Sequence, residues 1–147
     1  MARHEQPTAD AGFTLVELLV VTLIIGILAA IAIPSLFSQS DKARDAVAKA
    51  SARTAASAIE IYATDHGGSY VGATPQALQG IEPTLDPLTL DASGWDGTGA
   101  PDGHSYRVTA SSQTGNVFWM ARGASGTTTL GCDTAGQGGC PLDGRWG

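Results

Sequence analysis

Two cysteines near the C-terminus are the side chains best suited to covalent chemistry in this sequence of 147 residues. Cys132 and Cys140 enclose the short loop DTAGQGG. A bridge between them would stabilise the folded chain by about 2.5 kcal/mol, because it lowers the conformational entropy of the unfolded chain. Such a pair is typical of a disulfide in an exported domain. The alternative is a two-cysteine metal site, although no histidine lies close in sequence and neither cysteine belongs to a CxxC pair. The spacing favours the disulfide.

Motifs for enzymatic chemistry are missing from the sequence. Beyond the first twelve residues the histidines are His66 and His104, both in glycine-rich surroundings. No nucleophile elbow, glycine-rich phosphate loop or HExxH zinc motif accompanies them. We therefore expect a structural protein that is not an enzyme and needs no cofactor.

Two kinds of ligand are alternatives to this purely structural role. Aspartates in a glycine-rich stretch could bind calcium, which prefers oxygen ligands, but their spacing matches no EF-hand loop. These candidate ligands are Asp91, Asp96 and Asp102. Arginines with aromatic neighbours could contact DNA, but the formal net charge of −6 gives no general attraction to nucleic acid. These arginines are Arg107, Arg122 and Arg145.

A single carboxylate, Glu17, lies inside the most apolar stretch of the chain, from Phe13 to Ile33. The stretch has about 20 residues, enough for a helix to cross a hydrocarbon core of ~30 Å. Its large apolar side chains favour insertion by about 6 kcal/mol, and Glu17 opposes it by at most ~3 kcal/mol. We therefore expect a membrane helix. A charge in such a helix usually marks a functional site that needs a partner; the alternative is that Glu17 simply reaches the lipid headgroups.

The residues around the start of this stretch resemble a known processing signal. The polar residues 1–12 end in glycine, and the hexapeptide GFTLVE at 12–17 opens the apolar run. This string resembles the prepilin cleavage site of type IV pilins and type II secretion pseudopilins, over roughly residues 7–37. The resemblance implies cleavage after Gly12 by a membrane peptidase on the cytoplasmic side, followed by N-methylation of Phe13. A plain signal anchor is the alternative.

The same resemblance implies how the mature chain assembles. Glu17 would pair with the protonated amine of Phe13 on a neighbouring subunit, while the apolar helix is buried among further copies in a helical filament. The implied partners are a prepilin peptidase and methylase, the inner pilus assembly platform, and the membrane before assembly. We expect the precursor of a type IV pilin subunit, located in the cell membrane and then in an extracellular pilus. The alternatives are a pseudopilin of a type II secretion or competence system and an anchored binding module that never polymerises.

A second helical stretch follows the apolar run. Residues 41–65 are rich in alanine and lack glycine and proline, and small or apolar residues recur on one face at steps of three and four. This stripe consists of Ala43, Val47, Ala50, Thr54, Ala58 and Ile61. Off the stripe, Asp45 and Lys49 are an acid-before-base pair at the favourable spacing of four residues.

The join between the two helical stretches is Pro34, which removes a donor and clashes with the preceding turn. It predicts either a kink or a helix end. We expect one long bent helix over about residues 14–65, with Pro34 at the end of the assembly segment and the pair Gly67 and Gly68 as the stop signal.

The rest of the chain is predicted as a sheet behind a loop. Residues 67–103 contain a glycine or proline every few positions, with a short helix after Thr74 and leucine anchors at Leu85, Leu88 and Leu90. Alternation of period two then predicts an antiparallel sheet of three strands, with a fourth short strand after Cys140. The sheet would cover the helix stripe, which gives an α+β fold. The predicted strands are 105–110, 117–122 and 127–130.

The predicted organisation therefore has three parts. They are a prepilin leader at 1–12, a transmembrane and assembly helix at 13–34, and a pilin globular domain at 35–147 with loop 67–103, sheet 105–130 and disulfide loop 132–140. The disulfide loop resembles the C-terminal loop of many pilins, where it influences adhesion and subunit contacts, although this loop is shorter.

Overall fold

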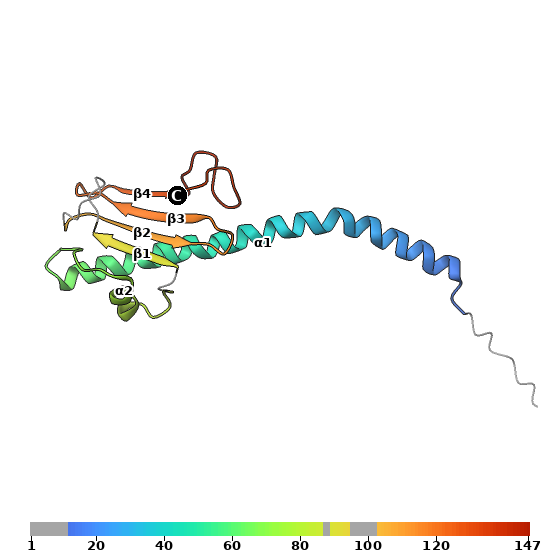
Figure 1. The fold of residues 1–147 in the computed structure, drawn as a ribbon, viewed down its shortest axis with the longest axis horizontal. Helices are drawn as coiled ribbons and strands as arrows, with labels where there is room; N and C mark the ends of the chain where they lie inside the picture. Colours follow the sequence, from blue (N-terminus) through green and yellow to red (C-terminus); the bar gives the residue numbers. More distant parts are fainter. Residues whose placement is uncertain (1–11, 87–88, 95–102) are drawn as a thin grey trace, which may run out of the picture. The chain divides into compact units, whose positions relative to one another are not determined.

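The computed structural model of the chain describes residues 12–86, 89–94 and 103–147. Its elements, in chain order, are α1 (Leu15–Asp65), α2 (Pro75–Ile81), β1 (Leu90–Gly94), β2 (Tyr106–Ser111), β3 (Val117–Arg122) and β4 (Thr128–Cys132) (Figure 1). The long helix with an antiparallel sheet confirms the predicted α+β class. The chain divides into two compact units between Phe37 and Ser38.

Helix α1 continues through Pro34, so the alternative of a helix that stops there is wrong. It ends at Asp65, where the Gly68 amide donates to the Ala63 carbonyl oxygen at 2.7 Å. Gly67 and Gly68 have φ angles of +66° and +86°, a left-handed conformation that glycine adopts without steric cost. The predicted stop signal is confirmed.

The buried face of α1 differs from the predicted stripe. Val47 is 66% exposed and Ile61 is 51% exposed, although Ala58 is buried. The buried side chains are Asp45, Ala48, Ala52, Ala55, Ala56, Ala58, Ile59 and Ala63. Six of these eight side chains are alanines, so the face of α1 that packs in the core is built mainly from small side chains. Periodicity placed the stripe correctly in spacing but on the wrong side of the helix.

The sheet has the order β1-β2-β3-β4, with every neighbouring pair antiparallel (Figure 1). The predicted fourth strand after Cys140 is wrong. The fourth strand is β1, which precedes the other three and pairs Leu90 with Ala110. Leu90 and Ala92 are buried, so this segment has the period of a strand although its glycine-rich surroundings predict a loop. After Cys140, the chain turns at Gly144 instead, with a φ of +70°.

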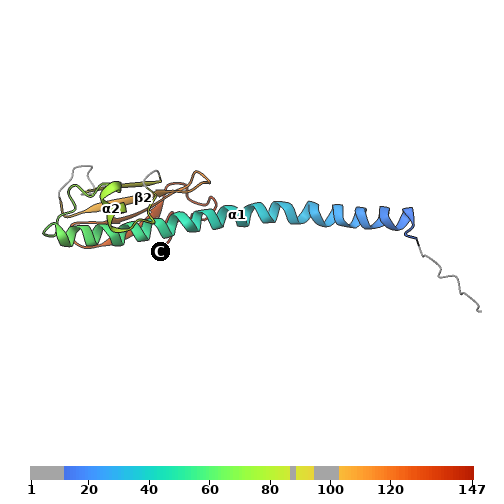
Figure 2. The same ribbon diagram turned by 90° about the horizontal axis from the view of Figure 1, so that it is seen from below.

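The core lies between the sheet and the second half of α1 (Figure 2). One cluster surrounds Ile59, Tyr106 and Val108, and includes the predicted anchors Leu85 and Leu90. The predicted anchor Leu88 lies outside the described residues. A second cluster consists of Ala48, Ala52, Ala110, Phe118, Cys132, Cys140 and Trp146. Helix α2 begins at its predicted cap, where Thr74 Oγ1 accepts a hydrogen bond from the Ala77 amide at 3.2 Å.

Glu60 joins three parts of this unit through one carboxylate. Its Oε1 forms an ion pair with Arg122 Nη1 at 2.6 Å, and its Oε2 accepts a hydrogen bond from the Tyr70 hydroxyl at 2.9 Å. Burial, together with the nearby Glu60 charge, raises the pKa of Tyr106 well above its usual value. The tyrosines therefore stay neutral donors, and the helix, the following loop and strand β3 are held together.

Candidate functional site

The predicted cleavage site lies directly before helix α1. Gly12 and Phe13 are exposed, and nothing approaches within 4 Å of a Cβ built on Gly12. Thr14 caps the helix: its Oγ1 accepts a hydrogen bond from the Glu17 amide at 3.1 Å. The peptide bond between Gly12 and Phe13 therefore lies in open, non-helical chain, as a peptidase substrate requires.

Glu17 lies in the first turn of α1. A carboxylate is favourable there, because the helix dipole places partial positive charge at the N-terminus. Thr14 and Glu17 also have the spacing of a capping box, a local sequence signal that marks where a helix begins. The cap fixes the first turn of the helix and so keeps Glu17 one turn from Phe13.

The segment from Phe13 to Phe37 presents a mostly apolar surface, in which Glu17 is the one charged side chain. Its large apolar side chains are 43–77% exposed. Within the described residues, α1 is the one helix that is long and apolar enough to span a membrane. Thr22 does not break this surface, because its hydroxyl donates to the Leu19 carbonyl oxygen at 3.0 Å. The surface suits lipid or copies of the same helix.

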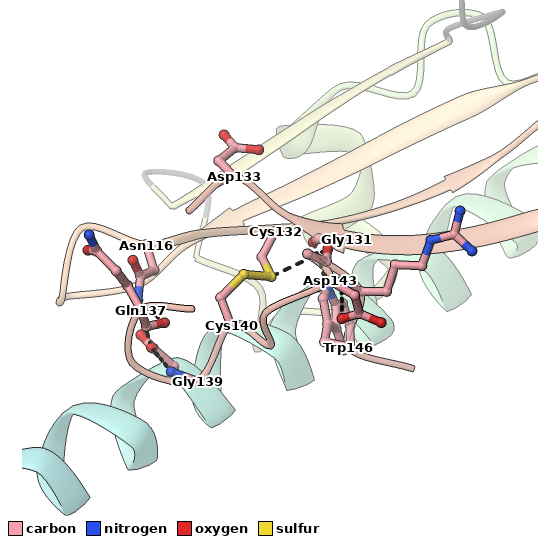
Figure 3. Close-up of a disulfide and its surroundings, with 12 residues drawn as sticks. Asn116, Gly131, Cys132, Asp133, Gln137, Gly139, Cys140, Asp143 and Trp146 are labelled. Atoms are coloured by element: carbon pink, nitrogen blue, oxygen red, sulfur yellow. Dashed lines mark hydrogen bonds between the residues drawn. A yellow bond between two sulfur atoms is a disulfide. The ribbon is translucent and has the colours of Figure 1, made fainter. Parts of the chain in front are cut away.

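At the other end of the chain, Cys132 and Cys140 form a disulfide with a Cα–Cα distance of 6.0 Å (Figure 3). Cys132 ends strand β4, and its amide donates to the Gly144 carbonyl oxygen at 2.9 Å. The Trp146 indole nitrogen donates to the Gly131 carbonyl oxygen at 2.6 Å. The segment that follows the disulfide thus folds back along the end of β4.

Trp146 is a core residue that no pattern in the sequence predicts. It is 8% exposed and packs edge-on against Phe118 at 6.2 Å between ring centroids. Two cations from α1 lie over its ring, Arg53 at 4.8 Å and Lys49 at 5.8 Å. A lone tryptophan among glycines gives no periodic signal, so only the fold shows that it anchors the C-terminal segment to the helix.

The prediction that Asp45 pairs with Lys49 along the helix is wrong. Asp45 is 0% exposed. Its carboxylate accepts hydrogen bonds from Thr114 Oγ1 at 2.5 Å, Asn116 Nδ2 at 2.8 Å and the Gly139 amide at 2.7 Å. Burial works to raise the pKa of Asp45, but the hydrogen bonds together outweigh it and leave the pKa below the usual 3.8. A charged carboxylate thus joins α1, the β2–β3 turn and the disulfide loop.

The alternative ligand sites gain no support. Asp96 and Asp102 lie outside the described residues, and Asp91 is part of strand β1. No cluster of three or more potential metal ligands occurs in the described part of the chain. Two of the arginines considered for DNA contact acidic side chains instead: Arg122 binds Glu60, and Arg107 lies 3.8 Å from Asp133.

Comparisons with known proteins agree with the N-terminal geometry. The family model for the prokaryotic N-terminal methylation motif matches residues 8–33. The type II secretion system core protein G of Pseudomonas aeruginosa is 33% identical over 138 residues, which cover 86% of this chain and 89% of that protein. The protein of the same name from Escherichia coli K12 is 35% identical over 82 residues, covering 54% of this chain and 55% of that protein. No solved structure matches significantly.

The motif and the exposed apolar helix define the class: a prepilin-type precursor, the class in which the N-terminus carries the cleavage and methylation motif. Within that class, the chain belongs to the family of the type II secretion system core protein G. The relationship favours the pseudopilin alternative over the pilus-subunit interpretation.

Proposed function

We propose that the chain is the precursor of a pseudopilin, which polymerises into a short filament of a type II secretion system. The observation that carries the proposal is the similarity to core protein G along 89% of that protein's length, combined with the methylation motif at residues 8–33. The apolar surface of the segment 13–37 supplies the driving force for assembly. The role is structural and needs no catalytic residues.

Processing is the first step of the proposal. A prepilin peptidase cleaves after Gly12 and a methylase modifies the amine of Phe13. Exposure of both residues in open chain supports this step. Before assembly the apolar helix anchors the chain in the cell membrane as a single pass.

Assembly is the second step. The helix leaves the lipid and packs against copies of itself, beginning at an assembly platform in the membrane. Glu17 pairs with the Phe13 amine of a neighbouring subunit, which neutralises both charges in a low-dielectric interior. Pro34 lies near the end of the segment that becomes the filament core, and the folded unit 38–147 faces outward.

Deleting the gene in its own organism separates the two filament types. We expect loss of secreted enzymes from the culture medium, with surface pili unchanged, and restoration of secretion by the wild-type gene. Glu17→Gln expressed in place of wild type should fail to restore it. Normal secretion combined with loss of sheared surface filaments would contradict the proposal and favour a pilus subunit. If the deletion leaves both secretion and surface filaments unchanged, an anchored module that does not polymerise is favoured.

A further inference from the structure

The loop that carries Cys140 is held to helix α1 by contacts that do not involve sulfur. Asp45 Oδ2 accepts a hydrogen bond from the Gly139 amide at 2.7 Å, and Lys49 Nζ donates to the Gly139 carbonyl oxygen at 2.5 Å. Asp45 and Lys49 are four residues apart, so they lie on one face of the helix. Two side chains from this face therefore hold both polar groups of the residue directly before Cys140.

The loop sequence fits this contact. A Cβ on Gly139 would lie 2.8 Å from Asp45 Cβ, and a Cβ on Gly138 would lie 2.8 Å from Asn116 Nδ2. Both distances are shorter than real side-chain contacts. Gly138 also has a φ of +55°, which side chains disfavour. Two adjacent glycines are thus required where the loop meets the buried carboxylate.

A third contact adds to this arrangement from the β2–β3 turn. Asn116 Nδ2 donates to Asp45 Oδ2 at 2.8 Å and lies 3.4 Å from the Gln137 carbonyl oxygen. Figure 3 shows Asn116, Gln137 and Gly139 beside one another next to the disulfide. Asn116 is 7% exposed and Asp45 is 0% exposed, so water does not compete strongly for these groups.

The other cysteine is positioned independently, by the sheet. Cys132 pairs with Phe118 across the β3–β4 ladder, and the next residue, Asp133, donates its amide to the Val117 carbonyl oxygen at 3.1 Å. These bonds involve neither Asp45 nor the disulfide. Each cysteine therefore has a backbone position that noncovalent contacts determine, and the two positions are 6.0 Å apart at Cα.

We propose that Asp45 is a positioning residue for the Cys132–Cys140 disulfide. By holding Gly139, it keeps the two thiols of the reduced, folded chain at a high effective concentration and so favours their oxidation. Linkage is reciprocal: the disulfide stabilises the docked loop by the same factor as docking stabilises the disulfide. The inference does not depend on whether the chain forms a secretion filament or a pilus.

Oxidised glutathione is the probe that measures this effect. One cysteine thiolate attacks a glutathione sulfur, which forms a mixed disulfide and releases one reduced glutathione. The second thiolate attacks the cysteine sulfur of the mixed disulfide and releases the other. The chain gives up two electrons and two protons, and oxidised glutathione takes them up. The equilibrium constant of the overall exchange with glutathione has units of concentration and equals the effective concentration of the two protein thiols.

The test compares full-length chains in detergent micelles at equilibrium with glutathione, quantified by thiol alkylation and mass spectrometry. For Asp45→Asn we expect the effective concentration to fall about tenfold, the size expected for a hydrogen bond to a charged group. The matched control is Asp41→Asn, which removes a half-exposed carboxylate one turn earlier, paired with Arg44 at 3.5 Å. The control should match wild type. An Asp45→Asn value within about threefold of wild type, or an equal fall in the control, would overturn the proposal.

A second measurement remains decisive even where Asp45→Asn fails to fold. In a chain carrying both Cys132→Ser and Cys140→Ser, the Gly139 amide should still exchange slowly with deuterium, because Asp45 holds it without the disulfide. Slow exchange of the Gly139 amide supports the proposal. Exchange as fast as that of an exposed loop amide would overturn it, because the disulfide would then be what positions the loop.

Discussion

The two halves of helix α1 use side-chain size in opposite ways. Between Phe13 and Phe37, the large apolar side chains are 43–77% exposed. Between Ala48 and Ala63, the buried side chains are almost all alanines, while Val47 is 66% exposed. The second half packs into the core of its own unit, mostly through small side chains. The first half carries side chains suited to a partner that its own unit does not supply.

The first half keeps its large apolar side chains available for burial against a partner, whereas the second half is already packed. Complete burial of one large apolar side chain stabilises by about 1.5–3 kcal/mol, and the first half offers a whole surface of them. In the folded unit, buried polar groups such as Asp45 and the packing of small side chains determine how the helix, sheet and loops fit together. Helix α1 is therefore continuous in backbone, while only its second half packs within its own folded unit.

We expect the strongest effect of any substitution at the processing site, directly before the first half of α1. Gly12→Leu should yield no mature chain, because a peptidase must bring the backbone close to its catalytic groups and a side chain would obstruct it. Mass spectrometry of the membrane fraction measures the cleaved form. The matched control is Gly26→Ala, at a glycine of the same segment with open space around it, which should be processed normally. A mature Gly12→Leu chain beginning at Phe13 would refute the cleavage site.

A second large effect concerns assembly. Glu17→Gln should be inserted and cleaved normally, yet filaments should become scarce, because each added subunit would bury an uncompensated amine at a cost of several kcal/mol. Electron microscopy of filaments formed with this variant as the only subunit provides the measurement. Thr22→Val is the control: it removes a hydroxyl that bonds only within the helix, and filament numbers should not change. Normal filaments from Glu17→Gln would show that charge pairing is not required.

In the folded half, Asp45→Ala should lower the free energy of unfolding by about 1–3 kcal/mol, because it leaves buried donors without an acceptor. Denaturant unfolding of the full chain measures the change. The folded-state pKa of Asp45 lies below its unfolded value of 3.8. Its contribution is therefore complete above that pH and is lost as the pH falls through the lowered folded pKa. The difference in free energy of unfolding between wild type and Asp45→Ala should become smaller below pH 3.8. A difference that does not change with pH would contradict a charged Asp45.

A comparison of Ala52→Leu with Val47→Ala, the substitution for which we expect the smallest change, tests which face of the second half of α1 is packed. Ala52→Leu should destabilise by about 1–3 kcal/mol, since Ala52 is 0% exposed and added atoms would separate helix and sheet. Val47→Ala should change stability by no more than about 0.5 kcal/mol, because Val47 is an exposed surface residue. Thermal and denaturant unfolding measure the loss of stability in each variant. A larger loss for Val47→Ala than for Ala52→Leu would reverse the assignment of the packed face.

Local signals in the sequence predicted much of this structure. The apolar run, the continuous long helix, its stop at Gly67 and Gly68 and the cap at Thr74 follow from composition and turn chemistry, which act over a few residues. Strands β2 to β4 followed from alternation. The motif at residues 12–17 identified the class of protein through its resemblance to known processing sites.

What could not be predicted depends on contacts between distant residues. The packed face of α1 is selected by the sheet, so helical periodicity alone placed it wrongly. Strand β1 is short and lies within a glycine-rich stretch, where pairing with β2 decides its structure. The roles of Asp45 and Trp146 depend on contacts with residues about 70 or more positions away in the chain. No local sequence pattern predicts such contacts.

We propose that the segment 13–37 forms the filament core and that the unit 38–147 forms its outer layer. Electron cryomicroscopy of filaments assembled from the processed chain shows directly where each segment lies. We expect the apolar helices to be packed together at the centre, with the Phe13 amine of one subunit beside Glu17 of another. Filaments whose subunits contact each other only through the unit 38–147, with the apolar helices outside the core, would contradict it.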